Sequence, residues 1–190
     1  PDVTATDVSG NEDTVIALDL TSSFSDTDGS EVMSIAISGI PDGAVLSSGT
    51  DSITVINGVA VVGQDQLANL AIQPAADDDS DFSLTMTATT SEDGTSATSS
   101  TVFNVDVTGV ADTPTVTVAD ASGTEDVAID LNISTGVTDT SESITSIEIT
   151  GVPDGASLNA GTSSTVDGVT TWTLSEGDLS GLQITPTPDS

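Results

Sequence analysis

Apolar and polar residues alternate along most of the chain, in short runs separated by turn-forming residues. In residues 82–88, FSLTMTA, every second residue is apolar, which is the period of a strand with one buried and one solvated face. Asn-Gly and Asp-Gly dipeptides such as Asn57-Gly58 predict tight turns between such runs. The predicted strands are 14–20, 32–39, 44–47, 52–56, 59–63, 67–73, 82–90 and 100–109. Because no long amphipathic helix is apparent, this spacing predicts an all-β fold of sandwich modules.

The chain repeats itself after about 113 residues. The segment SGIPDGAVL at 38–46 returns as TGVPDGASL at 150–158, and Pro1 aligns with Pro114. A fixed period of this kind indicates tandem modules. We therefore expect a complete β-sandwich module at 1–113, whose last residues form a joint. A second module of the same type is expected at 114–190.

The second module, aligned in this way, stops before the counterparts of the predicted strands at 82–90 and 100–109. Those strands carry a large share of the apolar residues expected in the core of the first module. The second module is therefore not expected to fold alone. Either the polypeptide continues and supplies the strands, which we favour, or a neighbouring chain inserts them.

The charge of the chain is entirely negative. It has 31 Asp and Glu residues, no Lys, Arg or His, and a formal net charge of −31. Such a chain repels itself when compact, so we expect it to need cations from solution. Disorder of the whole chain is the alternative, but 35% hydrophobic residues in strand-like alternation argue against it.

The missing residue types exclude several functions. Without basic side chains the chain has no means to bind nucleic acid or anionic lipid. Without Cys or His it has no thiol nucleophile, ordinary zinc site or Ser-His-Asp triad. A glycosidase with paired carboxylates stays formally open, but one Trp and three Phe offer little for a binding cleft. We expect no enzymatic activity, and no membrane insertion, because no apolar run approaches about 20 residues.

The acidic residues gather in the predicted loops, which points to a cation. Ca²⁺ takes six to eight oxygen ligands from carboxylates, carbonyls and water. The loop DTDGSE at 26–31 has this character, and four further acidic clusters lie in the first module. For one such loop a solvated turn would be the better interpretation, whereas five clusters without a basic residue favour calcium. The candidate ligands are Glu12, Asp13, Asp26, Asp28, Glu31, Asp77, Asp79, Asp81, Asp112, Asp139 and Glu142.

The ligands are expected to come from several loops, because neither the EF-hand spacing nor a glycine-rich nonapeptide is present. Successive loops of a sandwich alternate between its two ends. The loops at 12–13 and 77–81 are therefore expected to meet at the end nearest the second module, together with Asp112. The loops at 26–31 and 92–93 would share the opposite end. In the second module the facing loop, 139–142, is one residue shorter and lacks the second aspartate, so we expect fewer ions at this joint.

Four short motifs resemble the cadherin-like or immunoglobulin-like repeats of giant bacterial RTX adhesins, namely Asn11-Glu12-Asp13-Thr14, the DTDGSE loop, the SGIPDG turn and the joint that ends in Asp112. The similarity covers the whole chain through short motifs. It implies a protein that is exported by type I secretion and tethered to the bacterial surface, with calcium shared between modules. The positions that match the calcium scheme of animal cadherins are Glu12, Asp13, Asp79, Asp81, Asp112 and Asp139. Ser141, where that scheme has an acid, is a departure.

Three functions therefore remain. The first is a calcium-stiffened extender of a surface adhesin, whose partners are the neighbouring repeats of the same polypeptide. The second is a subunit of an extracellular filament or surface layer that assembles by sharing strands. The third is a calcium-dependent carbohydrate-binding module, for which the single tryptophan provides little stacking surface.

Overall fold

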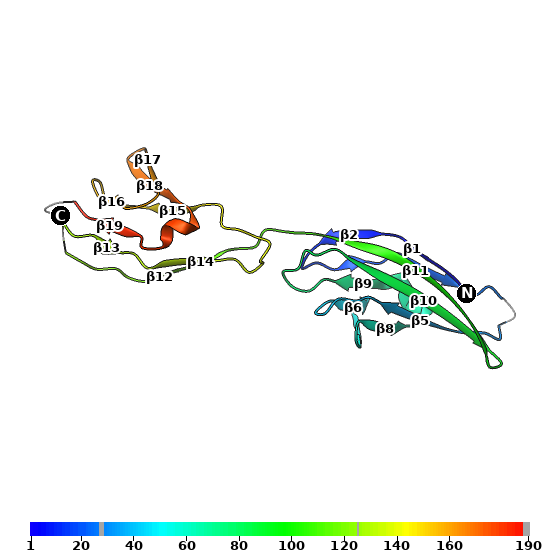
Figure 1. Ribbon diagram of the computed structural model, residues 1–190. Coiled ribbons are helices and arrows are strands. Elements are labelled where there is room, and N and C mark those ends of the chain that lie inside the picture. Colours follow the sequence, from blue (N-terminus) through cyan, green and yellow to red (C-terminus); the bar gives the residue numbers. More distant parts are fainter. Residues whose placement is uncertain (27–28, 125, 188–190) are drawn as a thin grey trace. The chain divides into compact units, whose positions relative to one another are not determined.

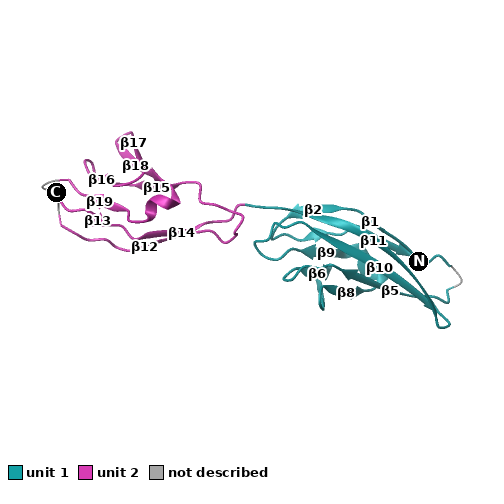
Figure 2. Cartoon of the chain, viewed as in Figure 1, with its two compact units in different colours: residues 1–110 teal, residues 111–190 magenta. Residues whose placement is uncertain are grey.

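The computed structural model describes residues 1–26, 29–124 and 126–187 (Figure 1). The chain forms two compact units, unit 1 at Pro1–Val110 and unit 2 at Ala111–Ser190, and each is described by itself (Figure 2). The described residues of both units form strands, with one short 3₁₀ helix in each, η1 at Gln64–Asn69 and η2 at Glu176–Leu179. The fold class is all-β, as the sequence predicts.

The residues described in unit 1 form two main sheets and a separate strand pair. Its strands are β1 (Asp2–Ala5), β2 (Val8–Asn11), β3 (Ile16–Ala17), β4 (Leu20–Ser23), β5 (Val32–Ser38), β6 (Val45–Ser48), β7 (Asp51–Ile53), β8 (Val59–Val62), β9 (Leu70–Gln73), β10 (Phe82–Glu92) and β11 (Thr95–Thr108). The five-stranded sheet has the order β2-β11-β10-β5-β8, the four-stranded sheet has the order β3-β9-β6-β7, and β1 pairs with β4. All pairs are antiparallel except β2 with β11.

The long β10–β11 hairpin forms the middle of the five-stranded sheet. Its turn, Asp93-Gly94, has positive φ at both residues, 44° and 81°, which suits the twist of a tight hairpin. Phe82 pairs with Val105 and Leu84 with Phe103, so apolar side chains of both strands fall on the same face of the sheet. Side chains of the two main sheets then form one core cluster. Its fully buried members include Ile35, Ile37, Leu46, Leu70, Ile72, Leu84, Met86, Phe103 and Val105.

The first 23 residues differ from the prediction, which had no strand before residue 14. Strands β1 and β2 lie there. Strand β1 pairs with β4, which belongs to the same segment, and β2 pairs with β11, which is distant in sequence. The predicted strand 14–20 is divided between β3 and β4, which belong to different sheets. Between them Leu18 N donates to Leu70 O at 2.9 Å. The start of the predicted strand 67–73 lies instead in η1.

The described part of unit 2 contains three small sheets. Its strands are β12 (Thr115–Val118), β13 (Ile129–Asp130), β14 (Ile133–Gly136), β15 (Ile147–Thr150), β16 (Ser157–Leu158), β17 (Thr162–Val166), β18 (Val169–Leu174) and β19 (Gln183–Thr185). They form the sheets β12-β14, β13-β19-β16 and β15-β18-β17. A core cluster of Leu158, Leu174 and Leu182 lies among half-buried apolar residues that include Trp172. Its buried part is much smaller than that of unit 1.

Candidate metal centre

Two acidic loops of unit 1 meet where β11 ends. One follows β2 and carries Glu12 and Asp13, and the other joins β9 to β10 and carries Asp77. The main-chain N–H of Asp77 donates to Asp13 Oδ1 at 3.2 Å. One carboxylate oxygen of Asp13 and one of Asp77 lie within 4.8 Å of each other, close enough for one cation to contact both. Both residues adopt positive φ, 56° and 54°, so tight local bends hold the carboxylates in place.

Glu12 lies in the interior of this end and is only 2% exposed. Its Oε1 accepts a hydrogen bond from the N–H of Val110 at 2.6 Å, and its own N–H donates to Thr108 O at 3.0 Å. A carboxylate in such a place is costly to bury unless strong donors or cations compensate its charge. The chain has no basic side chain to do so. Apart from the N-terminal amine, any positive charge that compensates Glu12 must therefore come from solution.

Asp79 and Asp81 extend this acidic group along the end of β11. A Cβ atom built on Gly109 would lie 3.2 Å from Asp79 Oδ2 and 3.7 Å from Glu12 Oε1, so both carboxylates lie against the backbone of Gly109. Asp81 Oδ1 accepts a hydrogen bond from the N–H of Val107 at 2.7 Å. The structure thus brings together five of the candidate ligands, namely Glu12, Asp13, Asp77, Asp79 and Asp81.

Unit 2 has an acidic group of its own, around Asp139. Asp139 is 4% exposed and accepts hydrogen bonds from Ser141 Oγ at 2.5 Å and from Ser141 N at 2.7 Å. The side-chain bond first, and the backbone bond next, hold the pKa of Asp139 below its ordinary value. Ser141, which sequence comparison marked as a missing acid, therefore supplies two donors to the neighbouring carboxylate.

Asp112 and Glu142 belong to the same group. The N–H of Asp112 donates to Glu142 Oε1 at 2.6 Å, and Thr138 Oγ1 donates to Asp112 Oδ2 at 3.3 Å. A cavity beside them is lined by both residues and by Ser141. All three candidate ligands of unit 2, Asp112, Asp139 and Glu142, thus lie in the loops that precede its β15.

The remaining candidate ligands, Asp26, Asp28 and Glu31, belong to a loop at the opposite end of unit 1. Asp26 and Glu31 line a hollow together with Phe24, and Asp28 lies outside the described residues. Ser30 Oγ donates a hydrogen bond to the carboxylate of Glu92, so this loop contacts the turn of the β10–β11 hairpin. The structure therefore places these two loops together.

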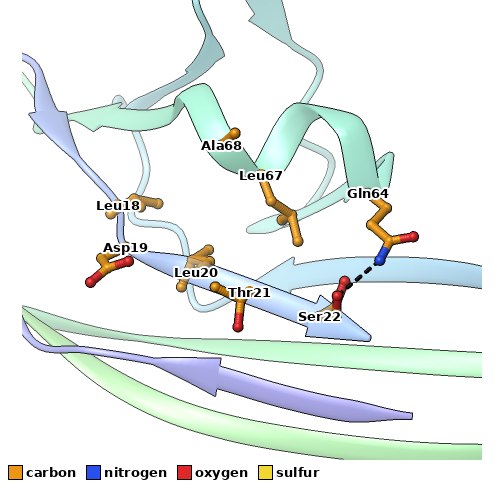
Figure 3. A pocket seen from close by; sticks show the side chains of 8 residues that line it. All are labelled: Leu18, Asp19, Leu20, Thr21, Ser22, Gln64, Leu67 and Ala68. Atoms are coloured by element: carbon orange, nitrogen blue, oxygen red, sulfur yellow. Dashed lines mark hydrogen bonds between the residues drawn. The ribbon is translucent and has the colours of Figure 1, made fainter. Parts of the chain in front are cut away.

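A further cavity of unit 1 lies between β4 and η1 (Figure 3). Three leucines, Leu18, Leu20 and Leu67, line it, and Gln64 Nε2 closes one side by donating to Ser22 O at 2.8 Å. Asp19 is its single ionisable residue. One carboxylate beside leucines provides neither a pair of ligands nor a nucleophile with its base, so we do not place the metal centre here.

The candidate site contains hydrogen-bond donors that sequence reasoning missed. The backbone N–H groups of Val107 and Val110 orient Asp81 and Glu12, and Ser141 orients Asp139. A backbone donor leaves no trace in residue type, whereas a serine two residues after an aspartate is a recognisable turn signal.

No protein-family model matches the chain, and neither does any curated protein. Among the residues that the structure describes, no helix has the length and apolar character needed to cross a bilayer.

Proposed function

We propose that the chain is a non-catalytic extender built of tandem modules and stiffened by calcium. The observation that supports this most strongly is the group of five carboxylates at the end of unit 1, one of them the buried Glu12. The carboxylates come from two loops that are far apart in sequence, as expected of an assembled cation site rather than of solvated turns. They surround the end of β11, the strand from which the chain runs on to unit 2.

The ligand chemistry favours calcium among the common metals. Every candidate ligand of the site is a carboxylate oxygen, and the chain has no Cys or His. Hard cations prefer oxygen ligands, and Ca²⁺ accepts more of them, in more irregular geometry, than Mg²⁺ does. Carboxylates on separate loops suit the flexible coordination of Ca²⁺ better than a strict octahedron.

Asp112 is within covalent reach of this site. Asp112 lies two residues after Val110, whose N–H donates a hydrogen bond to Glu12 Oε1. Consecutive Cα atoms lie about 3.8 Å apart, so two peptide units keep the Cα of Asp112 within roughly 7.6 Å of that of Val110. An ion bound by the acids of unit 1 would then draw a ligand from the connecting segment and restrict its torsions. This is the stiffening that we propose.

The finer assignment follows the resemblance described above. Immunoglobulin-like or cadherin-like modules in tandem, acidic at their ends and without basic residues, fit the extender region of a secreted bacterial surface adhesin. We propose an extracellular location on that ground, where calcium is plentiful enough for sites of modest affinity. The partners of such an extender are the neighbouring repeats of the same polypeptide.

Thermal unfolding in calcium and in EDTA, at matched ionic strength, tests the proposal. Calcium at about 100 times its dissociation constant stabilises a folded state by about 2.7 kcal/mol per site. We therefore expect clearly higher melting temperatures in calcium than in EDTA. Magnesium at the same concentration serves as the control for ionic screening. Identical melting curves in all three solutions would contradict the proposal.

Stiffening needs a separate measurement. Small-angle scattering of the whole chain should give a smaller spread of particle dimensions in calcium than in EDTA. Asp112→Asn should reduce that difference, and Asp51→Asn, an exposed carboxylate on β7, should not. A scattering profile that calcium leaves unchanged would remove the support for a stiffened joint, even if calcium raised the melting temperature.

A further inference from the structure

The outward face of the five-stranded sheet in unit 1 carries no carboxylate over most of its area. Inward side chains such as Ile37 and Met86 belong to the core, and strand alternation turns the residues between them to solvent. The outward positions are every second residue of 32–38, 83–91 and 96–104, together with Val59 and Val61. All of them are Val, Ala, Ser, Thr or Asn. We call this surface, which β8, β5, β10 and β11 form side by side, the neutral face (Figure 1).

The neutral face is unusual for this chain and is peculiar to unit 1. The protein has 31 Asp and Glu residues and no basic side chain, and in unit 2 Glu148 of β15 stands where unit 1 has Ala36. Three valines of the neutral face, Val32, Val61 and Val102, are 68%, 67% and 66% exposed. Single exposed apolar residues need no explanation, but several on one uncharged face indicate a surface that a partner covers.

Charge decides which partner suits this face. A basic partner would be drawn to the acidic loops and would find no carboxylate here. A second copy of the chain, which also has a net charge of −31, is repelled wherever carboxylates would face each other, and burial of such groups without counter-charges is costly. An uncharged face opposite an identical uncharged face avoids both costs. The neutral face therefore suits another copy of itself.

The neutral face is also complementary to itself in its pattern of side chains. One row across the sheet runs from Val59 to Ser38, Thr85 and Val102, because each of these residues is paired with the next. The row thus has a valine at each end and two hydroxyl groups in the middle. A two-fold axis parallel to the strands reverses their order in the second copy, so that valine faces valine and hydroxyl faces hydroxyl. Contacts of this kind are isologous, as in most dimers.

We propose that unit 1 pairs through its neutral face with the neutral face of a second copy of this chain. The two sheets pack face to face, about 10 Å apart. Val102 of the second copy then lies opposite Val59, which lines a largely apolar hollow with Ile53, Ile56 and Val61. The hollow gives that valine a concave surface to contact at the edge of the sheet. The Ser and Thr hydroxyls in the middle of the face act as both donors and acceptors, so two identical rows satisfy each other.

The size of the neutral face predicts weak pairing. Four strands about 4.8 Å apart, with about seven residues at about 3.4 Å each, outline roughly 450 Å². Two copies would then bury about 900 Å², which is less than the roughly 1,200 Å² of stable interfaces. We therefore expect a reversible dimer that forms at high protein concentration. Salt should strengthen it, since salt screens the repulsion between the acidic loops of the two copies and the contact itself contains no ion pair.

Sedimentation equilibrium of the whole chain, in EDTA and at millimolar protein concentration, tests the pairing. We expect a monomer–dimer equilibrium in about 0.5 M sodium chloride, where the Debye length is about 4 Å. In about 0.05 M salt, where the Debye length is roughly 14 Å, the dimer should be at least threefold weaker. The amide NMR shifts of Ser38 and Thr85 should follow the same equilibrium with protein concentration. A dimer held together by calcium between carboxylates would not form in EDTA.

Three single substitutions, each of which adds one negative charge, locate the contact. Ala36→Glu and Val102→Glu lie on the neutral face, and Val45→Glu lies on β6 of the other sheet, where the valine is 48% exposed. Unit 2 already has an exposed glutamate, Glu148, at the position of Ala36, so the strand accommodates this change. We expect the first two substitutions to weaken the dimer at least tenfold and the third to leave it unchanged within twofold.

Three results would overturn the proposal. The first is a chain that stays monomeric at millimolar concentration in high salt. The second is a dimer that Ala36→Glu and Val102→Glu weaken no more than Val45→Glu does. The third is a dimer that forms only in calcium, because carboxylates would then hold the two copies together. None of these results bears on calcium binding within one chain, so the two proposals can fail separately.

Discussion

The same strand sequence has different surroundings in the two units, and the difference shows what determines burial in this fold. Strands β5 and β15 carry isoleucines at equivalent positions. Ile35 and Ile37 are 0% exposed, whereas Ile147 and Ile149 are only half-buried. The local sequences are alike, and the covering strands of unit 1, β10 and β11, lie far along the chain from β5, at Phe82–Glu92 and Thr95–Thr108. The apolar pattern of a strand therefore determines which face can be buried, and distant strands determine whether it is.

Removal of β10 and β11 from unit 1 is expected to have the largest effect and tests the comparison most severely. A chain that ends at residue 80 lacks β10 and β11, which pair with β5 and β2 in the five-stranded sheet of unit 1. Each lost core side chain, such as Leu84 or Phe103, contributes about 1.5–3 kcal/mol, and domain stabilities are about 5–15 kcal/mol. We expect the fragment to lose cooperative thermal unfolding and to bind a hydrophobic dye. A fragment that unfolds cooperatively at the temperature of intact unit 1 would show that the hairpin is dispensable.

The equivalent pair Ile37 and Ile149 sharpens the comparison at single positions. Truncation of a buried isoleucine to alanine costs about 2–5 kcal/mol. Ile37→Ala should cost that amount in unit 1, and Ile149→Ala roughly half of it or less in unit 2, since its side chain is already partly in water. Amide exchange resolves unit 1, and Trp172 fluorescence follows unit 2. Equal losses at the two positions would mean that Ile149 is as well packed as Ile37.

Calcium affinity provides a smaller effect, confined to the end of unit 1. We expect Glu12→Gln to weaken calcium binding about tenfold, which corresponds to about 1.4 kcal/mol. The variant should be at least as stable as the natural chain in EDTA, because a neutral amide is less costly to bury than a carboxylate without a cation. Calorimetric titration and melting in EDTA measure the two effects. Asp51→Asn removes an exposed carboxylate of β7 and should change neither, and a similar response of both variants would contradict a localised site.

The acidic group of unit 2 gives the smallest effect, and it depends on pH. The lowered pKa of Asp139 stabilises the fold at pH values above the ordinary Asp value of 3.8, and this contribution is lost as the pH falls through the folded-state pKa. Ser141→Ala removes the larger cause, so the pKa of Asp139 should rise towards 3.8. Unit 2 of the variant should be slightly less stable near neutral pH and equally stable in strong acid.

Carboxyl NMR titration measures that pKa directly. Asp178, whose pKa is lowered by its hydrogen bonds to Ser175, is an internal control that Ser141→Ala should leave unchanged. An Asp139 titration identical in both chains would show that the Ser141 hydroxyl does not lower the pKa of Asp139.

The sequence predicted the all-β class and the buried face of the hairpin because period-two alternation is unambiguous at Leu84 and Phe103, which are 0% and 1% exposed. It also predicted the tight turn at Asn57-Gly58, where both residues have positive φ. Strand β2 escaped prediction because its strand structure depends on β11, which is remote in sequence. Propensity at Val8–Asn11 is too weak to reveal a partner so distant.

The candidate site was predictable in part for a related reason. The alternation of loops between sandwich ends indicated that residues 12–13 and 77–81 would meet, and the structure places Asp77 N on Asp13 Oδ1. The burial of Glu12 and its bond to Val110 N arise from packing around the end of β11. No local motif encodes that packing. The sequence could therefore identify these carboxylates as candidate ligands but could not show which of them is buried.

Anomalous diffraction from crystals of the whole chain grown in calcium tests the central claim most directly. We expect an anomalous peak among the carboxylates of Glu12, Asp13, Asp77, Asp79 and Asp81, with at least three of them at the 2.3–2.6 Å typical of calcium ligands. That peak should be absent from crystals soaked in EDTA. Crystals in which these carboxylates coordinate only water in the presence of millimolar calcium would contradict the account.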